Sequence, residues 1–175
     1  FWDASAMTAE VSACLAKEIG RRIGIRPEDA HTFALFRDCG IPMLMLPFPE
    51  YRSAWNRANG EAVLPFTEIE DQTIGLNHAD LGAQLAEDWL LPEETCQAIR
   101  YHHNVAALNG SLDLVPRARQ LIAIAQLAEY LIQEKSGQSQ TSEWGKLGAD
   151  CLASLDLTPE ALPELGTLCA SSVGS

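Results

Sequence analysis

Residues 69–104, IEDQTIGLNHADLGAQLAEDWLLPEETCQAIRYHHN, decide the fold, because they predict two amphipathic helices joined by a short turn. Asn77 is placed to cap the first of these helices. Pro92 opens the second, since proline suits the first position of a helix and the acids after it suit the positive end of the helix dipole. The apolar residues of the first helix recur at the spacing of one helix face: Leu81, Leu85, Ala86 and Trp89.

The sequence on either side predicts more helices and no convincing strand. Apolar residues that recur at every fourth position predict a helix, and Gly24 follows it as the glycine that commonly ends a helix. Residues 136–145 are polar and predict a short linker. We therefore expect an all-α fold, a bundle of about seven or eight helices. The other expected helical segments cover residues 11–23, 27–39 with an apolar continuation to 47, 67–76, 117–134, and a last one from Thr158.

The length, composition and charge of the chain limit what kind of protein it can be. The chain has 175 residues, is 47% hydrophobic, and carries 12 Lys and Arg against 24 Asp and Glu, for a formal net charge of -12. Such a length supports a proper core, and the negative field repels the phosphate backbone of nucleic acids. No apolar run is long enough to span a membrane. We therefore expect a cytoplasmic protein that binds neither nucleic acid nor membrane.

The five cysteines predict no cross-link. They are odd in number, widely scattered and never arranged as CxxC: Cys14, Cys39, Cys96, Cys151 and Cys169. This pattern indicates neither a disulfide framework nor a structural zinc site. We expect five buried, reduced thiols.

Four histidines and one acid are the candidates for chemistry. His31 is expected to be a surface or half-buried imidazole. His78 begins one helix of the central stretch, and His102 and His103 end the next; helices joined by so short a turn pack together, so these rings could share a pocket. The alternative is stabilisation of the last two by the helix dipole. Asp38, the only carboxylate in an apolar segment, is either a ligand or an acid turned to solvent.

The central stretch resembles the HDOD domain, the HD-related output domain of bacterial signalling proteins. Residues 1–5, FWDAS, are similar to the W-x-H-S helix of that family, and residues 34–40, ALFRDCG, to its GLLHDIG segment. The resemblance covers residues 1–135, which we expect to form the HD-like part, with residues 136–175 as a helical extension packed on it. The matching residues of the central stretch are Glu70, His78, Leu81-Gly82-Ala83, Trp89, Leu91-Pro92, Ile99 and His102-His103.

The resemblance also implies where a metal pocket would lie. HD enzymes are metal-dependent phosphohydrolases, in which imidazoles and carboxylates from several helices hold ions that activate water. The first histidine of the pattern falls on Ala4, the His-Asp pair on Arg37-Asp38, and the final aspartate on Gln126, while His78 and either His102 or His103 match later histidines of the pattern. Three of the expected ligands are therefore lost, and we expect no bound metal and no cofactor. The degenerate pocket would comprise Ala4, Arg37, Asp38, His78, His102, His103 and Gln126.

Arg37 argues against catalysis. A guanidinium has no free lone pair and repels a divalent cation. It could fill the space beside Asp38 and pair with that residue or with a neighbouring carboxylate. Adjacent residues of a helix diverge by about 100°, so Arg37 could equally turn to solvent. The sequence leaves both placements open.

The remaining marked residues are expected to be scaffold. Trp89 is expected in the core, and Gly82 at a close contact between helices. Glu70 either bonds His78 or a helix start or faces water, and the second placement is preferred. Trp144 either fixes the final helices to the body or marks a contact surface.

The resemblance implies a non-catalytic regulatory module of bacterial signal transduction that binds signalling proteins or a small ligand. We expect receiver or cyclic-di-nucleotide modules on the same chain or on partner chains. Because the sequence begins at Phe1 and not at a Met, we also expect residues before Phe1. One alternative is an HD-type phosphohydrolase with a reduced ligand set, acting on a nucleotide or phosphodiester; the set would be Asp38, His78, His102 and His103. Another alternative is a purely structural oligomerisation element.

Overall fold

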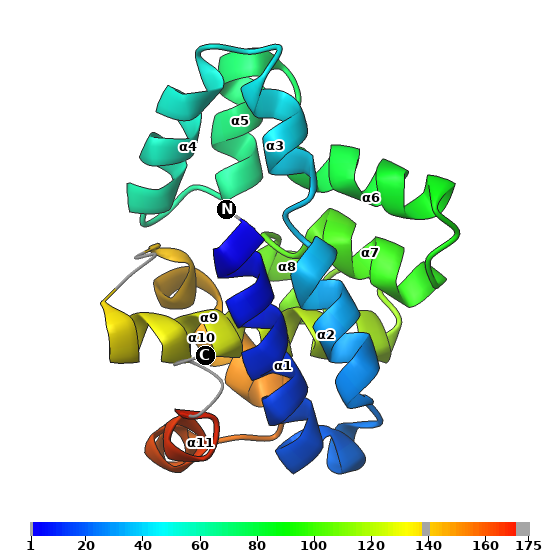
Figure 1. Cartoon of the computed structure of the whole chain (residues 1–175), viewed down its shortest axis with the longest axis vertical. Coiled ribbons are helices and arrows are strands. Elements are labelled where there is room, and N and C mark those ends of the chain that lie inside the picture. Colours follow the sequence, from blue (N-terminus) through cyan, green and yellow to red (C-terminus); the bar gives the residue numbers. More distant parts are fainter. Residues whose placement is uncertain (1, 138–140, 171–175) are drawn as a thin grey trace.

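The structure is a computed structural model that describes residues 2–137 and 141–170, and these residues form helices and no strand (Figure 1). The expected all-α class is confirmed. Eight of the described α-helices have nine residues or more, which fits the expected number. The bounds are α1 Trp2–Ile23, α2 Pro27–Phe36, α3 Gly40–Met45, α4 Tyr51–Gly60, α5 Phe66–Ile74, α6 His78–Asp88, α7 Glu93–Tyr101, α8 Val105–Leu108, α9 Pro116–Ser136, α10 Glu143–Ser154 and α11 Leu162–Leu168, with a 3₁₀ turn at Pro159–Ala161.

Helix α9 forms the centre of the core. Every residue from 121 to 128 is buried, as expected for a helix surrounded by protein on all sides. Helices α1, α2, α7 and α10 pack against it. A polar side chain on α9 therefore meets other side chains rather than water, and this matters for Gln126 and Glu129.

Helices α3, α4 and α5 form a smaller group at one end of the molecule (Figure 1). Tyr51 is the largest side chain of its core and is fully buried with Ile41 and Leu44, while Phe66 and Ile69 form an adjoining apolar cluster. Helices α6 and α7 pack side by side, and α6 also packs on α3. The candidate site lies where this smaller group meets α7 and α9.

Several helix boundaries differ from the sequence-based expectation. Helix α2 ends at Phe36, and residues 37–39 form a turn before α3 instead of continuing the helix. Helix α4 was not expected. Helix α10 begins at Glu143, inside the expected linker 136–145, of which residues 138–140 lie outside the described part. These helices gain their stability from packing rather than from a pattern visible in the local sequence.

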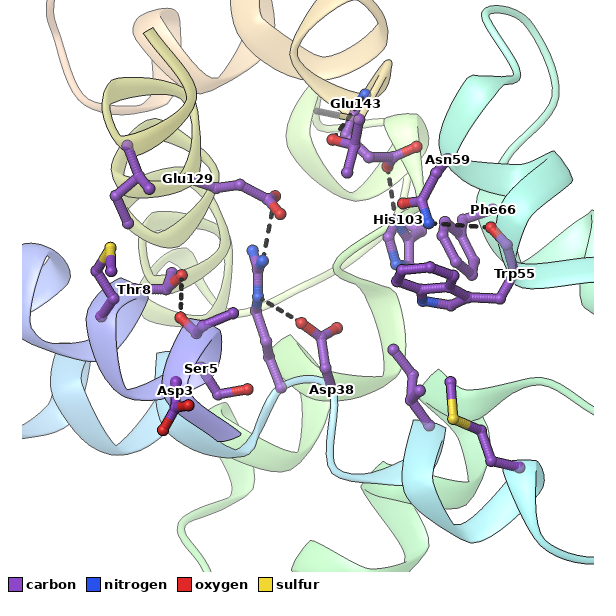
Figure 2. A pocket seen from close by; sticks show the side chains of 17 residues that line it. Asp3, Ser5, Thr8, Asp38, Trp55, Asn59, Phe66, His103, Glu129 and Glu143 are labelled. Carbon is purple, nitrogen blue, oxygen red and sulfur yellow. Dashed lines mark hydrogen bonds and ion pairs between the residues drawn. The ribbon is translucent and has the colours of Figure 1, made fainter. Parts of the chain in front are cut away.

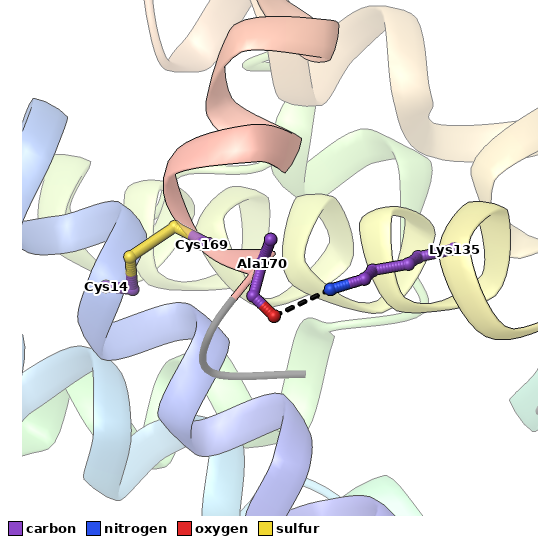
Figure 3. The surroundings of a disulfide bond; sticks show 4 residues. All are labelled: Cys14, Lys135, Cys169 and Ala170. Carbon is purple, nitrogen blue, oxygen red and sulfur yellow. Dashed lines mark hydrogen bonds between the residues drawn. A yellow bond between two sulfur atoms is a disulfide. The ribbon is translucent and has the colours of Figure 1, made fainter. Parts of the chain in front are cut away.

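The expectation of five reduced cysteines is wrong for two of them. Cys14 of α1 and Cys169, just after α11, form a disulfide with Cα atoms 5.9 Å apart (Figure 3). They are 155 residues apart in the sequence, so only the packing of α11 near α1 reveals that they meet. The other three cysteines are buried free thiols, as expected: Cys39, Cys96 and Cys151.

The expected scaffold residues have mixed outcomes. A Cβ added at Gly82 would lie 3.2 Å from Ile99 and 3.3 Å from the sulfur of Cys39, which confirms the close helix contact. Trp89 is not in the core: it is 54% exposed and its ring packs edge-on against Phe36. The reason is that α6 ends at Asp88, so the helical stripe no longer fixes the direction of the next side chain.

Trp144 fixes α10 to the body of the protein. Its ring stacks on Tyr130 of α9, with ring centroids 4.4 Å apart. Of the two alternatives left by the sequence, the anchoring contact is the one observed. No helix in residues 2–137 and 141–170 is both long enough and apolar enough to cross a membrane.

Candidate functional site

A close approach of α3 to α6 brings Asp38 beside His78. A Cβ added at Gly40 would lie 2.1 Å from the carbonyl oxygen of His78, so only glycine lets the two helix starts approach so closely. The turn 37–39 then carries Asp38 over the first turn of α6. Its Oδ1 lies 3.5 Å from Nε2 of His78 and 3.2 Å from Nε2 of His102.

Glu70 of α5 holds His78 from the other side. Its carboxylate accepts hydrogen bonds from the backbone N–H of His78, 3.2 Å away, and from the hydroxyl of Tyr51, 2.5 Å away. It also lies 2.8 Å from Nδ1 of His78. Glu70 is fully buried, so the preferred expectation that it faces water is wrong. The contacts with His78 and Tyr51 offset part of the free energy that it costs to bury this carboxylate.

His102 and His103 follow α7 and are anchored separately. Nδ1 of His102 donates to the carbonyl oxygen of Ile99, 2.7 Å away. Nδ1 of His103 lies 2.6 Å from a carboxylate oxygen of Glu143 on α10. The His103 ring also stacks on Phe66, with centroids 4.8 Å apart. Both rings are buried.

Asp38, His78, His102 and His103 form one cluster. One ligand atom from each lies within 4.8 Å of those from the others. The Nε2 atoms of His78 and His102 are 3.2 Å apart. Of the histidines, only His31 lies elsewhere, half-exposed on α2 and 3.6 Å from Glu10. The structure thus brings together the three rings that the sequence marked.

The protonation of the cluster follows from its charges. Burial lowers the pKa of His78, but the carboxylates of Glu70 and Asp38 outweigh it and raise the pKa to about 9. Burial and the neighbouring His103 lower the pKa of His102 to about 4. His78 is therefore charged and His102 neutral at pH 7, so that the Nε2–H of His78 faces the lone pair on Nε2 of His102, 3.2 Å away.

Arg37 turns inward and pairs with two carboxylates. It is 5% exposed, and its guanidinium lies 3.1 Å from Asp38 Oδ2 and 3.1 Å from Glu129 Oε2. Figure 2 shows Asp38 and Glu129 on either side of this ion-pair bridge. Burial would raise the pKa of Asp38, but the charge of Arg37, helped by the neighbouring imidazole of His78, holds it well below its usual value. The guanidinium therefore balances charge that would otherwise be unpaired.

Glu129 and Glu143 are site residues that the sequence analysis did not identify. Glu129 lies three residues after Gln126 on α9, hence on the same helix face, so its place in an apolar helix was a usable signal. Glu143 gave no signal, because it lies in a polar segment 40 residues from His103. Its position depends on how α10 packs.

Ala4 and Gln126 occupy the edge of the site. Ala4 lines the same cavity as Asp38 and has no side-chain atom that could bind a metal. Gln126 is buried, and its side-chain amide lies 3.5 Å from the carbonyl oxygen of His102 as a weak donor. Neither residue supplies the imidazole or carboxylate that the HD pattern has at that position.

A cavity of about 600 Å³ opens onto the cluster. Asp38 and His103 line it, with Phe66 and Trp55 on one wall and Asp3 near its edge (Figure 2). Its charged lining is mostly acidic: Asp3, Asp38, Glu129 and Glu143 against Arg37. Asp38 and Glu129 engage two nitrogens of the Arg37 guanidinium, Nε and Nη2, and balance its charge.

The donor chemistry decides whether a metal fits. The HD ligand pattern is incomplete, since Ala4, Arg37 and Gln126 cannot replace two imidazoles and a carboxylate. The ligands that remain, Asp38 and the three rings, do fit a transition-metal ion, because they offer imidazole nitrogens and one carboxylate at short range. Bound there, such an ion would supply Lewis acidity.

Comparison with known proteins places the fold. An uncharacterised protein of Treponema pallidum is 28% identical over 104 residues, which is 59% of this chain and 20% of that protein. Three similar crystal structures align with most of this chain. The aligned part is less than two thirds of the length of each of those proteins.

One is an HDOD domain protein of unknown function from Geobacter sulfurreducens, at 18% identity and TM-score 0.57, with 98% and 61% of the two chains covered. The response regulator MmoQ of Methylococcus capsulatus has 21% identity and TM-score 0.57, covering 94% and 58%. A protein of Shewanella amazonensis, named as a candidate phosphohydrolase, has 17% identity and TM-score 0.63, covering 99% and 63%. Because the sequence identities are this low, the comparison shows that the proteins share a fold and shows nothing about function.

The family assignment comes from the sequence match together with this fold. The HDOD domain matches residues 1–105, which include Arg37, Asp38, His78 and the His102-His103 pair. The chain therefore belongs to the HDOD domain family.

Proposed function

We propose that this chain is a non-catalytic module of bacterial signal transduction, which acts by binding a signalling protein or a small ligand. One observation carries the proposal: Arg37 stands where the HD pair has its histidine, and it is buried between Asp38 and Glu129. A fixed positive charge beside Asp38 opposes a catalytic pair of metal ions at this position. The response regulator among the structural neighbours supports a signalling role.

An assay of phosphodiester hydrolysis tests the non-catalytic part. The full chain would be incubated with a chromogenic phosphodiester in the presence of Mn²⁺ or Mg²⁺, with Asp38→Ala as the comparison. We expect both proteins to give the same background rate. A rate for the unchanged chain that Asp38→Ala abolishes would refute the proposal.

A binding experiment tests whether the chain binds a signalling protein or a small ligand. The immobilised chain would be exposed to bacterial extract, and the retained proteins and small molecules identified by mass spectrometry. A regulatory module should retain a defined partner at constant stoichiometry, and free chain in solution should compete it away. Retention of nothing beyond further copies of this chain would instead favour a structural oligomerisation element.

The second candidate function is an HD-type phosphohydrolase with a reduced ligand set. The observation in its favour is the convergence of Asp38, His78, His102 and His103 within 4.8 Å. The phosphodiester assay separates it from the first proposal, since only this candidate needs a turnover that depends on Asp38.

A further inference from the structure

The cavity next to the histidine cluster is large enough for a small organic molecule. Its volume is about 600 Å³, and pockets that take small organic ligands measure roughly 300–1,000 Å³. Such pockets are mostly apolar and have a few polar groups that orient the ligand. This cavity has the same mixture, because apolar side chains form much of its wall: Met7, Ile41, Met45, Trp55, Phe66 and Ile132. It therefore suits a ligand with an apolar body.

The aromatic side chains of the cavity lie together on one side. Trp55 of α4 packs against the apolar clusters that contain Tyr51 and Phe66, and it also lines the cavity. Figure 2 shows Trp55 near Phe66 and His103, with Glu129 on the opposite side. An aromatic face attracts other rings and also cations. Trp55 therefore offers a binding face for an aromatic group or for a positive charge.

Carboxylates outnumber basic side chains around the cavity. Two cations oppose them apart from the histidines: Arg37 pairs with Asp38 and Glu129, and Lys146 pairs with Glu143. This excess favours a positively charged ligand over a negatively charged one. The carboxylates that line the cavity are Asp3, Asp38, Glu129 and Glu143.

The charge of Glu129 is only partly balanced. Within residues 2–137 and 141–170 its one ion-pair partner is Arg37, 3.1 Å away, which Asp38 shares. Burial raises the pKa of Glu129, and the charge of Arg37 does not fully offset this, since Asp38 raises the pKa further. A raised pKa means that the protein stabilises this negative charge less well than water does. A cation bound beside Glu129 would supply the missing positive charge.

We propose that this cavity binds a small organic cation, an amine with an aromatic or other apolar body, whose ammonium group lies beside Glu129 and whose body lies against Trp55. The inference rests on the proposed function, because the amine is then the small ligand that the module binds. Neither Glu129 nor Trp55 is among the residues that match the HD pattern. Asp3, exposed near the edge of the cavity, attracts cations towards it.

An anionic ligand such as a phosphate has a poorer match in the same cavity. Arg37 is the one guanidinium in the lining, and its Nε and Nη2 are engaged by Asp38 and Glu129. A bound anion would have to compete with these two carboxylates for the guanidinium, and the nearby carboxylate of Glu143 would add repulsion. The sign of the charge on the ligand is therefore the property to test.

Three ligands of similar shape and different charge test the inference on the full chain. They are phenethylammonium, the neutral phenethyl alcohol and the anion phenylacetate, each titrated by calorimetry at low ionic strength. We expect phenethylammonium to bind with a dissociation constant on the order of 1 mM or lower. It should bind about 10-fold tighter than the alcohol, and phenylacetate should bind most weakly. No binding of phenethylammonium, or equal affinities for the cation and the anion, would overturn the inference.

Two variants separate the charged contact from the aromatic one. Glu129→Gln keeps the size of the side chain and removes its charge, so it should weaken phenethylammonium by about 10-fold and leave phenethyl alcohol nearly unchanged. Trp55→Leu keeps an apolar side chain and removes the aromatic face, so it should weaken both ligands by about 3-fold or more. A variant that merely distorted the cavity would not distinguish the cation from the alcohol.

Glu134→Gln and Trp89→Leu are the matched controls. Glu134 is exposed on α9, the helix that carries Glu129, and Trp89 is exposed just after α6. Neither residue lines the cavity, so both variants should bind phenethylammonium as the unchanged chain does. Circular dichroism of each variant checks that it is folded. Unchanged affinity for phenethylammonium in folded Glu129→Gln and Trp55→Leu would also overturn the inference.

The two proposals fail in different ways. Selective binding of phenethylammonium together with hydrolysis that depends on Asp38 would refute the non-catalytic function and leave the amine site standing. No binding of phenethylammonium and no hydrolysis would refute the amine site and leave the non-catalytic function standing.

Discussion

Arg37 and Gly40, three residues apart, shape the site by different means. Arg37 brings a permanent charge inside the protein, where Asp38 and Glu129 neutralise it. Gly40 contributes the absence of a side chain, which lets α3 approach the backbone of His78. The first residue determines what the pocket can bind, and the second determines whether Asp38 reaches the imidazoles at all.

Replacing Gly40 should therefore damage both stability and site geometry. A Cβ at this position would lie 2.1 Å from the backbone oxygen of His78, and a backbone atom cannot move aside without shifting α6. We expect Gly40→Ala to lower the free energy of unfolding by about 2 kcal/mol or more, measured by urea denaturation.

Gly60→Ala is the control for this prediction. Gly60 ends α4, and a Cβ there meets no atom within 4 Å. The control should be neutral or more stable by up to about 1 kcal/mol, because alanine favours the helix. Equal stabilities of the two variants would contradict the close approach of α3 and α6.

Among the elements, α10 connects the end of the chain to the site. Glu143, in its first turn, bonds His103 and forms an ion pair with Lys146. Lys146 also donates to the carbonyl oxygen of Leu64, 3.1 Å away, and Trp144 stacks on Tyr130 of α9. Thus α10 holds together segments that precede α5, follow α7 and lie within α9.

The attachment of α10 should weaken in acid. Burial alone would raise the pKa of Glu143, but His103 and Lys146 outweigh it and lower the pKa to about 2 from an ordinary 4.5. The group binds a proton more weakly in the folded state, so its contribution is complete above about pH 4.5 and is lost as the pH falls towards 2. The contribution is on the order of 3 kcal/mol.

Denaturation of the unchanged chain and of Glu143→Gln between pH 7 and pH 2 measures this effect. The variant should be less stable at pH 7, and the difference should shrink as the pH falls. Glu18→Gln, at an exposed position of α1, should follow the unchanged chain throughout. A difference between unchanged chain and Glu143→Gln that stays constant with pH would argue against the buried ion pair.

Across the whole molecule, the disulfide ties the first helix to the last one described. Cys14 lies in the middle of α1, and Cys169 follows α11 (Figure 3). Close by, Lys135 at the end of α9 donates to the carbonyl oxygen of Ala170, 2.6 Å away. Only Leu165 is buried within α11, so the cross-link supplies much of the attachment of this helix.

Reduction of the disulfide should lower the stability of the oxidised protein. A cross-link that closes a loop of this length restricts the unfolded chain, and its loss costs about 2–5 kcal/mol. Denaturation with and without reductant measures the change, and Cys14→Ser should reproduce the reduced value. Alkylation of the oxidised, unfolded chain should label three thiols, those of Cys39, Cys96 and Cys151; five labelled thiols would disprove the cross-link.

The sequence by itself determined the helical class and several helix boundaries. Asn77 caps α6 by accepting from the N–H of Asp80, and Gly24 follows α1 with a φ of 74°. The run from 117 to 134 lies within α9. The family could be recognised because its signature is concentrated in one continuous stretch. These features depend on residues within a few positions of each other, so periodicity and capping suffice to predict them.

Only the tertiary structure decided which polar groups meet. The inward placement of Arg37 depends on the turn 37–39 and on Glu129, more than 90 residues later in the chain. Glu70, Glu143 and the Cys14–Cys169 pair likewise owe their partners to the packing of distant helices. Helical patterns specify which face of a helix is apolar, but they do not specify which neighbour covers that face. The contacts that decide charge balance and ligand geometry in this protein are therefore set by the packing of α5, α9 and α10 around α6 and α7.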